Sequence, residues 1–133
     1  ECSEEVKVRA ELRKLWGAAS LSLSATTVRV PVARGHSVAA WLELARPVSP
    51  RAAAAMAAAV PGVVCWEAGS YPTPLGTGGG DAVHAARWRR GAGPRELALW
   101  VVTDNLLKGA ALNSIQTAEA LLAKGWLKPR RPT

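Results

Sequence analysis

Alternating apolar and polar positions predict several strands along the chain. In residues 21–32 one face carries valines and the other carries polar residues or proline, as expected for a strand with one polar face: Val28, Val30 and Val32 against Thr27, Arg29 and Pro31. Residues 36–45 alternate again after a turn at Arg34-Gly35, so we expect them to return beside the first strand. Residues 63–66 form a short apolar strand candidate. Residues 83–90 and 96–103 are two more, and the turn-like residues between them favour an antiparallel pair.

Three segments carry helix signals. Ser3, followed by two acidic residues, is typical of a helix start, and this helix should run to about Trp16 before Gly17 ends it. Ser49 as cap and Pro50 at the first helical position predict a second helix to about residue 60. Asp104 should cap a final helix, residues 104–124, whose apolar residues recur at spacings of three and four: Leu107, Ala111, Ile115, Ala118 and Leu122. Residues 70–81, with prolines and three consecutive glycines, should form a loop.

The order of these elements predicts an α+β fold with a largely antiparallel mixed sheet and helices packed on one face. The chain has 133 residues, 49% hydrophobic and 20% charged, which fits a single domain spanning residues 1–133. It has no apolar run long enough to cross a bilayer, so no membrane insertion is expected.

The net charge of +7 raises the possibility of nucleic-acid binding. The arginines are scattered, however, and dense only around residues 87–95 and in the tail Lys128-Pro129-Arg130-Arg131, which argues against that class and favours a solvated basic face or an anionic substrate. Cys2 and Cys65 are too few for a disulfide framework or a metal quartet and are expected to be reduced thiols. Because the sequence starts without methionine, we expect it to be a piece of a longer protein.

A few polar residues are candidates for chemistry, and each also has a structural interpretation. Glu4 and Lys7 lie on one face of the first predicted helix together with Glu11 and Lys14, which is typical of a solvent-facing ladder of ion pairs. Arg29, in a strand of small and β-branched residues, suits an anion site or an edge charge. His36, just past a glycine turn, has the pKa range for proton transfer, although a lone histidine is more often structural.

Four ordered strings resemble the aspartate-semialdehyde dehydrogenase family, over nearly the whole chain. The first helix is similar to the family's E-E-W-K…E-T-x-K helix, and the next segment to its S-A-T-x-V-R-V-P-V…G-H-S signature. The strings are Glu4-Glu5-Val6-Lys7 with Glu11-Leu12-Arg13-Lys14, then Ser24-Ala25-Thr26-Thr27-Val28-Arg29-Val30-Pro31-Val32 with Gly35-His36-Ser37, then Tyr71-Pro72-Thr73-Pro74-Leu75, and finally Leu99-Trp100-Val101-Val102-Thr103-Asp104-Asn105-Leu106-Leu107-Lys108-Gly109.

The resemblance implies the C-terminal part of an NADP-dependent enzyme that reduces aspartyl-4-phosphate to aspartate semialdehyde in amino-acid biosynthesis. It implies a fold like the C-terminal domain of glyceraldehyde-3-phosphate dehydrogenase-like enzymes. Arg29 would hold the substrate's α-carboxylate, Glu4 would meet its α-ammonium group, and Lys7 would contribute to the phosphate site. His36 would be the general acid/base, and Asn105 would lie near the nicotinamide cofactor.

Two family features are missing from the sequence. Neither cysteine stands in the family's Asn-Cys nucleophile context, and the glycines at 78–80 open no strand-turn-helix fingerprint for a dinucleotide. We therefore expect NADP to bind only through a missing N-terminal domain, against which the final helix would pack. Val6 also replaces the family's usual tryptophan, so the pocket wall is expected to differ.

Three interpretations are open. In the first, the chain is the catalytic and dimerisation domain of such a dehydrogenase. It would form a homodimer through the sheet, contact its own N-terminal domain or join a larger assembly, and it would be cytoplasmic, or organellar in a eukaryote. In the second, the domain is a non-catalytic structural or interaction subunit. The third, a relative of N-acetylglutamyl-phosphate reductase, suits the Arg-Val-Pro-Val and Asp-Asn-Leu-Leu-Lys-Gly strings poorly.

Overall fold

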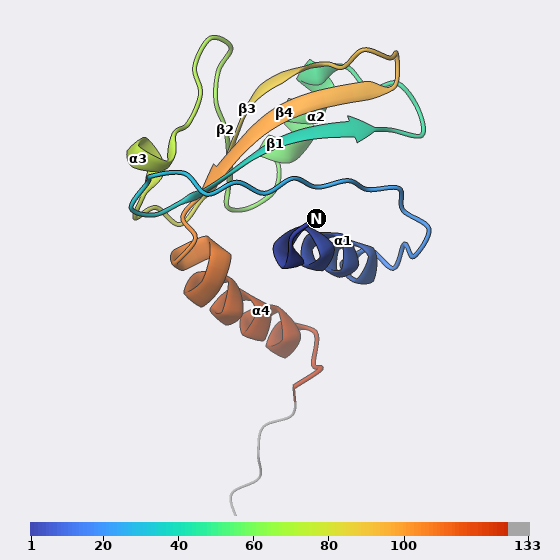
Figure 1. Ribbon diagram of the computed structural model, residues 1–133. Coiled ribbons are helices and arrows are strands. Elements are labelled where there is room, and N and C mark those ends of the chain that lie inside the picture. Colours follow the sequence, from blue (N-terminus) through green and yellow to red (C-terminus); the bar gives the residue numbers. More distant parts are fainter. Residues whose placement is uncertain (128–133) are drawn as a thin grey trace, which may run out of the picture. The chain divides into compact units, whose positions relative to one another are not determined.

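The computed structural model describes residues 1–127, which fall into two compact units (Figure 1). The first unit is Glu1–Pro31 and the second begins at Val32. The basic tail at residues 128–131, singled out in the sequence, lies outside the described residues.

The first unit contains helix α1, Ser3–Leu15, followed by an extended segment. Cys2, and not the predicted Ser3, is the N-cap residue, because the Glu5 carboxylate reaches back and accepts a hydrogen bond from the Cys2 amide at 3.0 Å. Gly17 follows the helix with a positive φ of 60°, as predicted for a residue that ends it. The helix boundaries were thus predicted to within about one residue.

The strand predicted over residues 21–32 is wrong. These residues form no strand, and the strand expected to pair with them pairs elsewhere. Alternation of side chains predicts only that a segment is extended, whereas a strand also needs a hydrogen-bonding partner. The Thr27 amide instead donates to the Glu5 carboxylate at 2.9 Å, which ties this segment to the start of α1.

The second unit is built on a four-stranded mixed sheet in the order β1-β4-β3-β2. The strands are β1 (His36–Glu43), β2 (Val63–Cys65), β3 (Val83–Arg90) and β4 (Glu96–Thr103). β4 pairs antiparallel with β1 and with β3, while β2 runs parallel to β3. The predicted fold class and the antiparallel pairing of the last two strands are confirmed.

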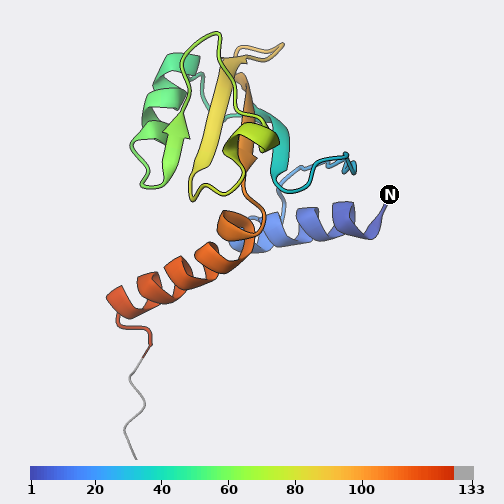
Figure 2. The same ribbon diagram turned by 90° about the vertical axis from the view of Figure 1, so that its left-hand side faces the viewer.

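One face of the sheet is covered by helix α2, Pro50–Ala58, as Figure 2 shows. The helix begins as predicted, with the Ser49 hydroxyl accepting from the Ala52 amide at 3.1 Å and Pro50 at the first helical position. The thiol of Cys65 points to this helix and donates to the Ala54 carbonyl at 3.4 Å. The buried apolar side chains lie on β3 and β4: Ala85, Ala86, Leu97, Ala98 and Val102.

The opposite face is crossed by the segment between β2 and β3. The indole of Trp100 donates to the Pro72 carbonyl at 2.9 Å, and a one-turn helix, α3 (Pro74–Thr77), follows within the predicted loop. This helix was not predicted, because four residues are too few to show a helical period. Thr73 caps it by accepting from the Gly76 amide at 3.1 Å.

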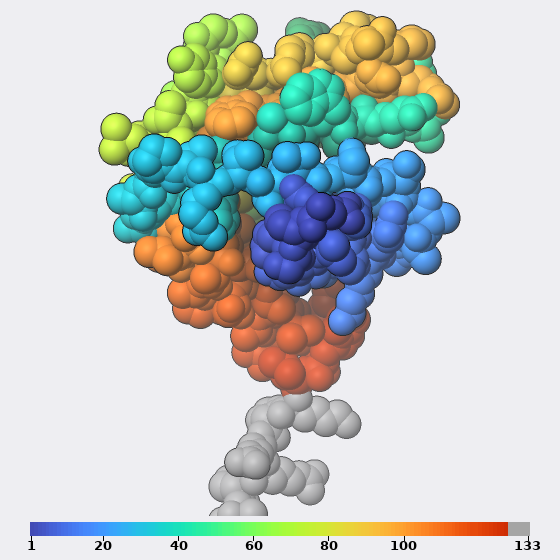
Figure 3. All heavy atoms as spheres, viewed as in Figure 1, coloured from blue at the N-terminus to red at the C-terminus, as the bar shows by residue number. Residues whose placement is uncertain are grey.

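The chain leaves the sheet through a widened turn, η1 (Leu107–Ala111), into helix α4, Leu112–Ala123. The final helix was predicted over residues 104–124, but the run begins at Leu107 and its first turn is not α-helical. Asp104 precedes it and acts as the predicted cap, because its carboxylate accepts hydrogen bonds from the Leu106 and Leu107 amides. None of the residues of α4 is buried. In Figure 3 the atoms of α4, orange to red, lie uncovered on the face that is seen. Ile115 and Leu122 are 57% and 58% exposed. Among residues 1–127, no helix is long and apolar enough to span a membrane.

Candidate functional site

The five residues predicted for the site are divided between the two units. Glu4, Lys7 and Arg29 belong to the first unit, and His36 and Asn105 to the second. Within each unit the structure brings some of them together.

In the first unit, Glu4 and Lys7 form an ion pair along α1. The Lys7 ammonium donates to the Glu4 carboxylate at 3.3 Å, and both side chains are more than half exposed. Such a pair contributes little to stability, so both charges remain available to a ligand. Arg29 lies exposed in the extended segment, two residues beyond the Thr27 amide that is fixed to Glu5.

Neither cysteine is placed like a prepared nucleophile with a base beside it. The Cys2 thiol is exposed at the start of α1, and its hydrogen bond with the Thr27 hydroxyl, 3.2 Å away, lowers its pKa. Cys65 is half-buried under α2. Across residues 1–127, no group of three or more histidine, cysteine or acidic side chains is arranged to hold a metal ion.

In the second unit, His36 and Asn105 lie at the same end of the sheet. His36 begins β1 and is paired in register with Thr103, the last residue of β4. Asn105 follows two residues later, and its side-chain oxygen accepts a hydrogen bond from the Gly35 amide at 2.6 Å. The backbone just before the exposed His36 is therefore held by Asn105, which lies in the turn after β4.

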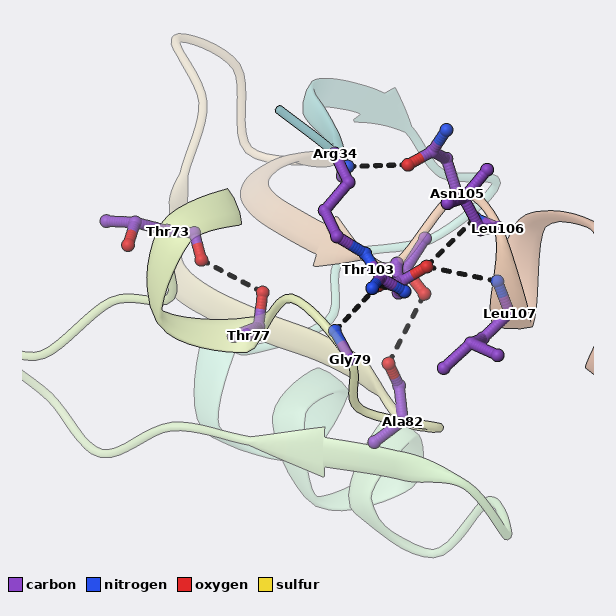
Figure 4. Close-up of polar contacts among 11 residues, drawn as sticks. Arg34, Thr73, Thr77, Gly79, Ala82, Thr103, Asn105, Leu106 and Leu107 are labelled. Atoms are coloured by element: carbon purple, nitrogen blue, oxygen red, sulfur yellow. Dashed lines mark hydrogen bonds and ion pairs between the residues drawn. The ribbon is translucent and has the colours of Figure 1, made fainter. Parts of the chain in front are cut away.

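Beside this pair lies a fully buried carboxylate, that of Asp104. Three backbone amides and the side chain of Arg34 contact this carboxylate, and Figure 4 labels the residues that supply them: Arg34, Gly79, Leu106 and Leu107. One oxygen accepts from Leu106 and Leu107 at 2.9 and 3.0 Å, which caps the start of η1. The other accepts from the Gly79 amide at 2.7 Å and pairs with Arg34 at 2.5 Å. Asp104 thus joins the residues before β1, the glycine loop and the start of the last helical run.

These contacts keep Asp104 ionised although burial opposes its charge. The hydrogen bond from Gly79 has the largest effect, and together with those from Leu107 and Leu106 and the charge of Arg34 it lowers the pKa of Asp104. Asp104 is 0% exposed, whereas the Arg34 side chain is 38% exposed, so the carboxylate is the desolvated partner. The Arg34 Nε is buried without a partner among the described residues.

Gly35 is required by the geometry of this region. Its φ is +105°, and a Cβ placed there would lie 2.9 Å from the Cβ of Pro74. Any larger residue would displace α3 or the backbone that carries His36.

Sequence reasoning recognised Asp104 only as a helix cap and did not predict the roles of Arg34 and Gly79. A signal for them was present, since an aspartate, a glycine run with free amides and an arginine before a glycine turn can form a charge-assisted cluster. The sequence could not show that these distant segments meet.

The chain matches a family model described as semialdehyde dehydrogenase, dimerisation domain, over residues 1–108. It is 42% identical over 130 residues to an aspartate-semialdehyde dehydrogenase of Synechocystis sp., covering 95% of this chain and 38% of that protein. It is 42% identical over 125 residues to one of Streptomyces akiyoshiensis, covering 93% of this chain and 36% of that protein. The chain therefore spans little more than a third of the length of these relatives.

Comparison with solved structures also finds aspartate-semialdehyde dehydrogenases. A probable aspartate-semialdehyde dehydrogenase from Pseudomonas aeruginosa superposes with a TM-score of 0.86 at 35% identity, covering 96% of this chain and 38% of that one. Aspartate semialdehyde dehydrogenase II from Vibrio cholerae, complexed with ASA, also gives a TM-score of 0.86, at 34% identity, covering 91% of this chain and 37% of that one.

Proposed function

We propose that this chain, which belongs to the semialdehyde dehydrogenase dimerisation-domain family, is the C-terminal part of an NADP-dependent aspartate-semialdehyde dehydrogenase. Such an enzyme converts aspartyl-4-phosphate to aspartate semialdehyde and releases phosphate. The observation that carries the proposal is the support of His36 by Asn105 through Gly35, because it presents an acid/base group beside a second predicted site residue.

The substrate-binding roles are proposed for the first unit. Arg29 holds the substrate carboxylate by a charge-assisted pair, Glu4 meets the ammonium group and Lys7 contributes to the phosphate site. The exposure of all three side chains is compatible with these roles. We also propose that residues 1–133 act together as one domain of the dimerisation type.

NADP, when bound, supplies or accepts the hydride. Among residues 1–127, the glycine run is not followed by a helix of the dinucleotide-binding kind, and the Gly79 amide is already engaged by Asp104. The chain's residues therefore suit only a contact at the edge of the cofactor. Asn105 is the proposed residue for it, since its oxygen is bound to Gly35 and its amide N–H groups remain to donate.

Two surfaces are proposed to be covered in the complete protein. The part of the sheet around the edge strand β1, where Trp41 is 66% and Val38 52% exposed, would form a homodimer interface in a cytoplasmic enzyme. Helix α4 would pack on the N-terminal cofactor domain, because its apolar residues are otherwise left in water.

The test is an assay of the complete polypeptide that carries this sequence, measured as phosphate-dependent reduction of NADP by aspartate semialdehyde. We expect His36→Ala to lower kcat by about 10²–10⁴-fold with little change in KM, since that is the usual contribution of a general acid/base. Arg29→Gln should mainly raise KM, and the exposed Arg46→Gln is the matched control.

If the His36→Ala enzyme has the same kcat as the wild type, the proposed acid/base role of His36 is wrong. A native polypeptide of only 133 residues, without activity but bound to other proteins, would favour the second candidate, a non-catalytic subunit derived from this domain. The missing nucleophile context of Cys2 and Cys65 is the observation that keeps this candidate open.

A further inference from the structure

A cleft of about 580 Å³ opens at the edge of the sheet, and none of the residues of the proposed catalytic site lines it. It exists because β2 ends at Cys65 after pairing only with the first residues of β3, so the later part of β3 has a free edge there. The N-terminal end of α2 and the turn at residues 66–71 wall this edge. Among the lining residues are Arg51, Trp66, Ser70, Tyr71, Arg87 and Trp88.

Arg87 enters the cleft from a β-bulge. The pairing of β3 with β4 slips by one residue between Ala86 and Arg89, and Arg87 has a positive φ of 55°. Glycine is the residue that takes this conformation without strain, and no other described non-glycine residue has a positive φ. A strained arginine that lines a cleft points to a function for its side chain.

The cleft has more positive than negative charge. Three arginines line it against one carboxylate, that of Glu67. Arg89 is already engaged, since it donates to the Arg87 carbonyl at 3.1 Å and its guanidinium lies over the Trp41 ring. Within the described part of the chain, Arg51 and Arg87 make no ion pair or side-chain hydrogen bond, so two guanidinium groups remain for an anion.

Aromatic side chains supply the rest of the wall. Trp66 is fixed by its indole, which donates to the His84 ring at 3.1 Å. Trp88 lines the cleft, and its indole nitrogen is buried without a partner among residues 1–127. Tyr71 is 57% exposed at the rim. Such rings bind planar groups by stacking, and guanidinium groups bind phosphate or carboxylate bidentately.

We propose that this cleft binds a small anion that carries a planar ring, of the nucleoside monophosphate type. The ring lies among Trp66, Trp88 and Tyr71, and the phosphate is held by Arg51 and Arg87. The volume is in the range of small-molecule sites. The proposal does not depend on the dehydrogenase function, because it uses none of the residues assigned to catalysis.

The test is calorimetric titration of the full chain with AMP, with adenosine and with inorganic phosphate. We expect AMP to bind more tightly than either of its parts. Arg51→Gln and Arg87→Gly should each weaken AMP binding about tenfold or more, as loss of a charge-assisted hydrogen bond does. Arg46→Gln, which removes an exposed arginine outside the cleft, should leave AMP binding unchanged.

Arg87→Gly also separates binding from folding, since glycine suits the bulge and should keep or raise the melting temperature. In NMR spectra, the indole signals of Trp66 and Trp88 should shift with AMP while that of Trp16 stays in place. The proposal is overturned if AMP does not bind at millimolar concentration, if phosphate alone binds as well as AMP, or if the arginine substitutions leave the affinity unchanged.

Discussion

The strain at Arg87 predicts an unusual ranking of two substitutions. Arg87→Ala and Arg87→Gly both remove the guanidinium group, but only glycine relieves a φ of 55°. A left-handed conformation costs an L-residue about 1–2 kcal/mol, and glycine in a strand loses about 0.5–1 kcal/mol relative to alanine through its greater freedom when unfolded. The glycine variant should therefore be more stable than the alanine variant by about 0.5–1 kcal/mol.

The free energy of unfolding of both variants can be measured by urea denaturation, followed by tryptophan fluorescence. For a chain of this size the difference corresponds to about 2–4 °C in melting temperature. The hydrogen bond from Arg89 to the Arg87 carbonyl is kept in both variants and so does not affect the comparison. An alanine variant that is as stable as the glycine variant, or more stable, would refute the assignment of strain to this residue.

Three further predictions concern titration and packing. The lowered pKa of Asp104 means that its contribution to stability is present above the unfolded pKa of about 4 and is lost as the pH falls through the lower folded value. Asp104→Asn should therefore be less stable than the wild type at pH 7, by a margin that shrinks in urea denaturation curves taken at progressively lower pH; a constant margin would contradict this. Partial burial lowers the pKa of His84, and its ring nitrogen accepts from the Trp66 indole, so an NMR titration should give a value below about 6.5 that rises in Trp66→Phe. Leu97, only 2% exposed, should lose about 2–5 kcal/mol on change to alanine. Leu75→Ala, at a residue 93% exposed, should stay within about 0.5 kcal/mol of the wild type in the same urea experiment.

Much of the second unit was predictable because its signals are local. The strands β3 and β4 were predicted with their residue bounds, and Ser49 with Pro50 marked the start of α2. The strand prediction for residues 21–32 was wrong because a strand needs a hydrogen-bonding partner as well as an alternating pattern. The pattern lies within the segment, whereas the partner would have to come from another part of the chain. Helix α3 was not predicted because a single turn is too short to show a helical repeat of apolar residues.

The candidate site was predictable only as separate residues. Proximity of His36 to Asn105 depends on the register of β1 with β4, which brings Gly35 to the Asn105 side chain across 70 residues of sequence. The importance of Asp104 beyond capping depends on its burial, and burial is a property of the packed sheet. The roles of Glu4, Lys7 and Arg29 came from the family resemblance and stay predictions.

The widened turn η1 also determines which way the side chains of α4 face. The Gly109 amide bonds to the Asp104 carbonyl and the Ala111 amide to the Leu106 carbonyl, both five residues back. Each such turn holds one residue more than an α-helical turn, which rotates the remainder of the helix by about 100° around its axis. Ile115 therefore lies on a different face of the helix from the one that an uninterrupted α-helix starting at Leu107 would give it. Deleting one residue in this turn would rotate α4 about its axis and direct different side chains toward a given neighbour, although the sequence of α4 itself would be unchanged. The number of residues in the turn, as well as the identity of the side chains, therefore determines which surface α4 presents for packing.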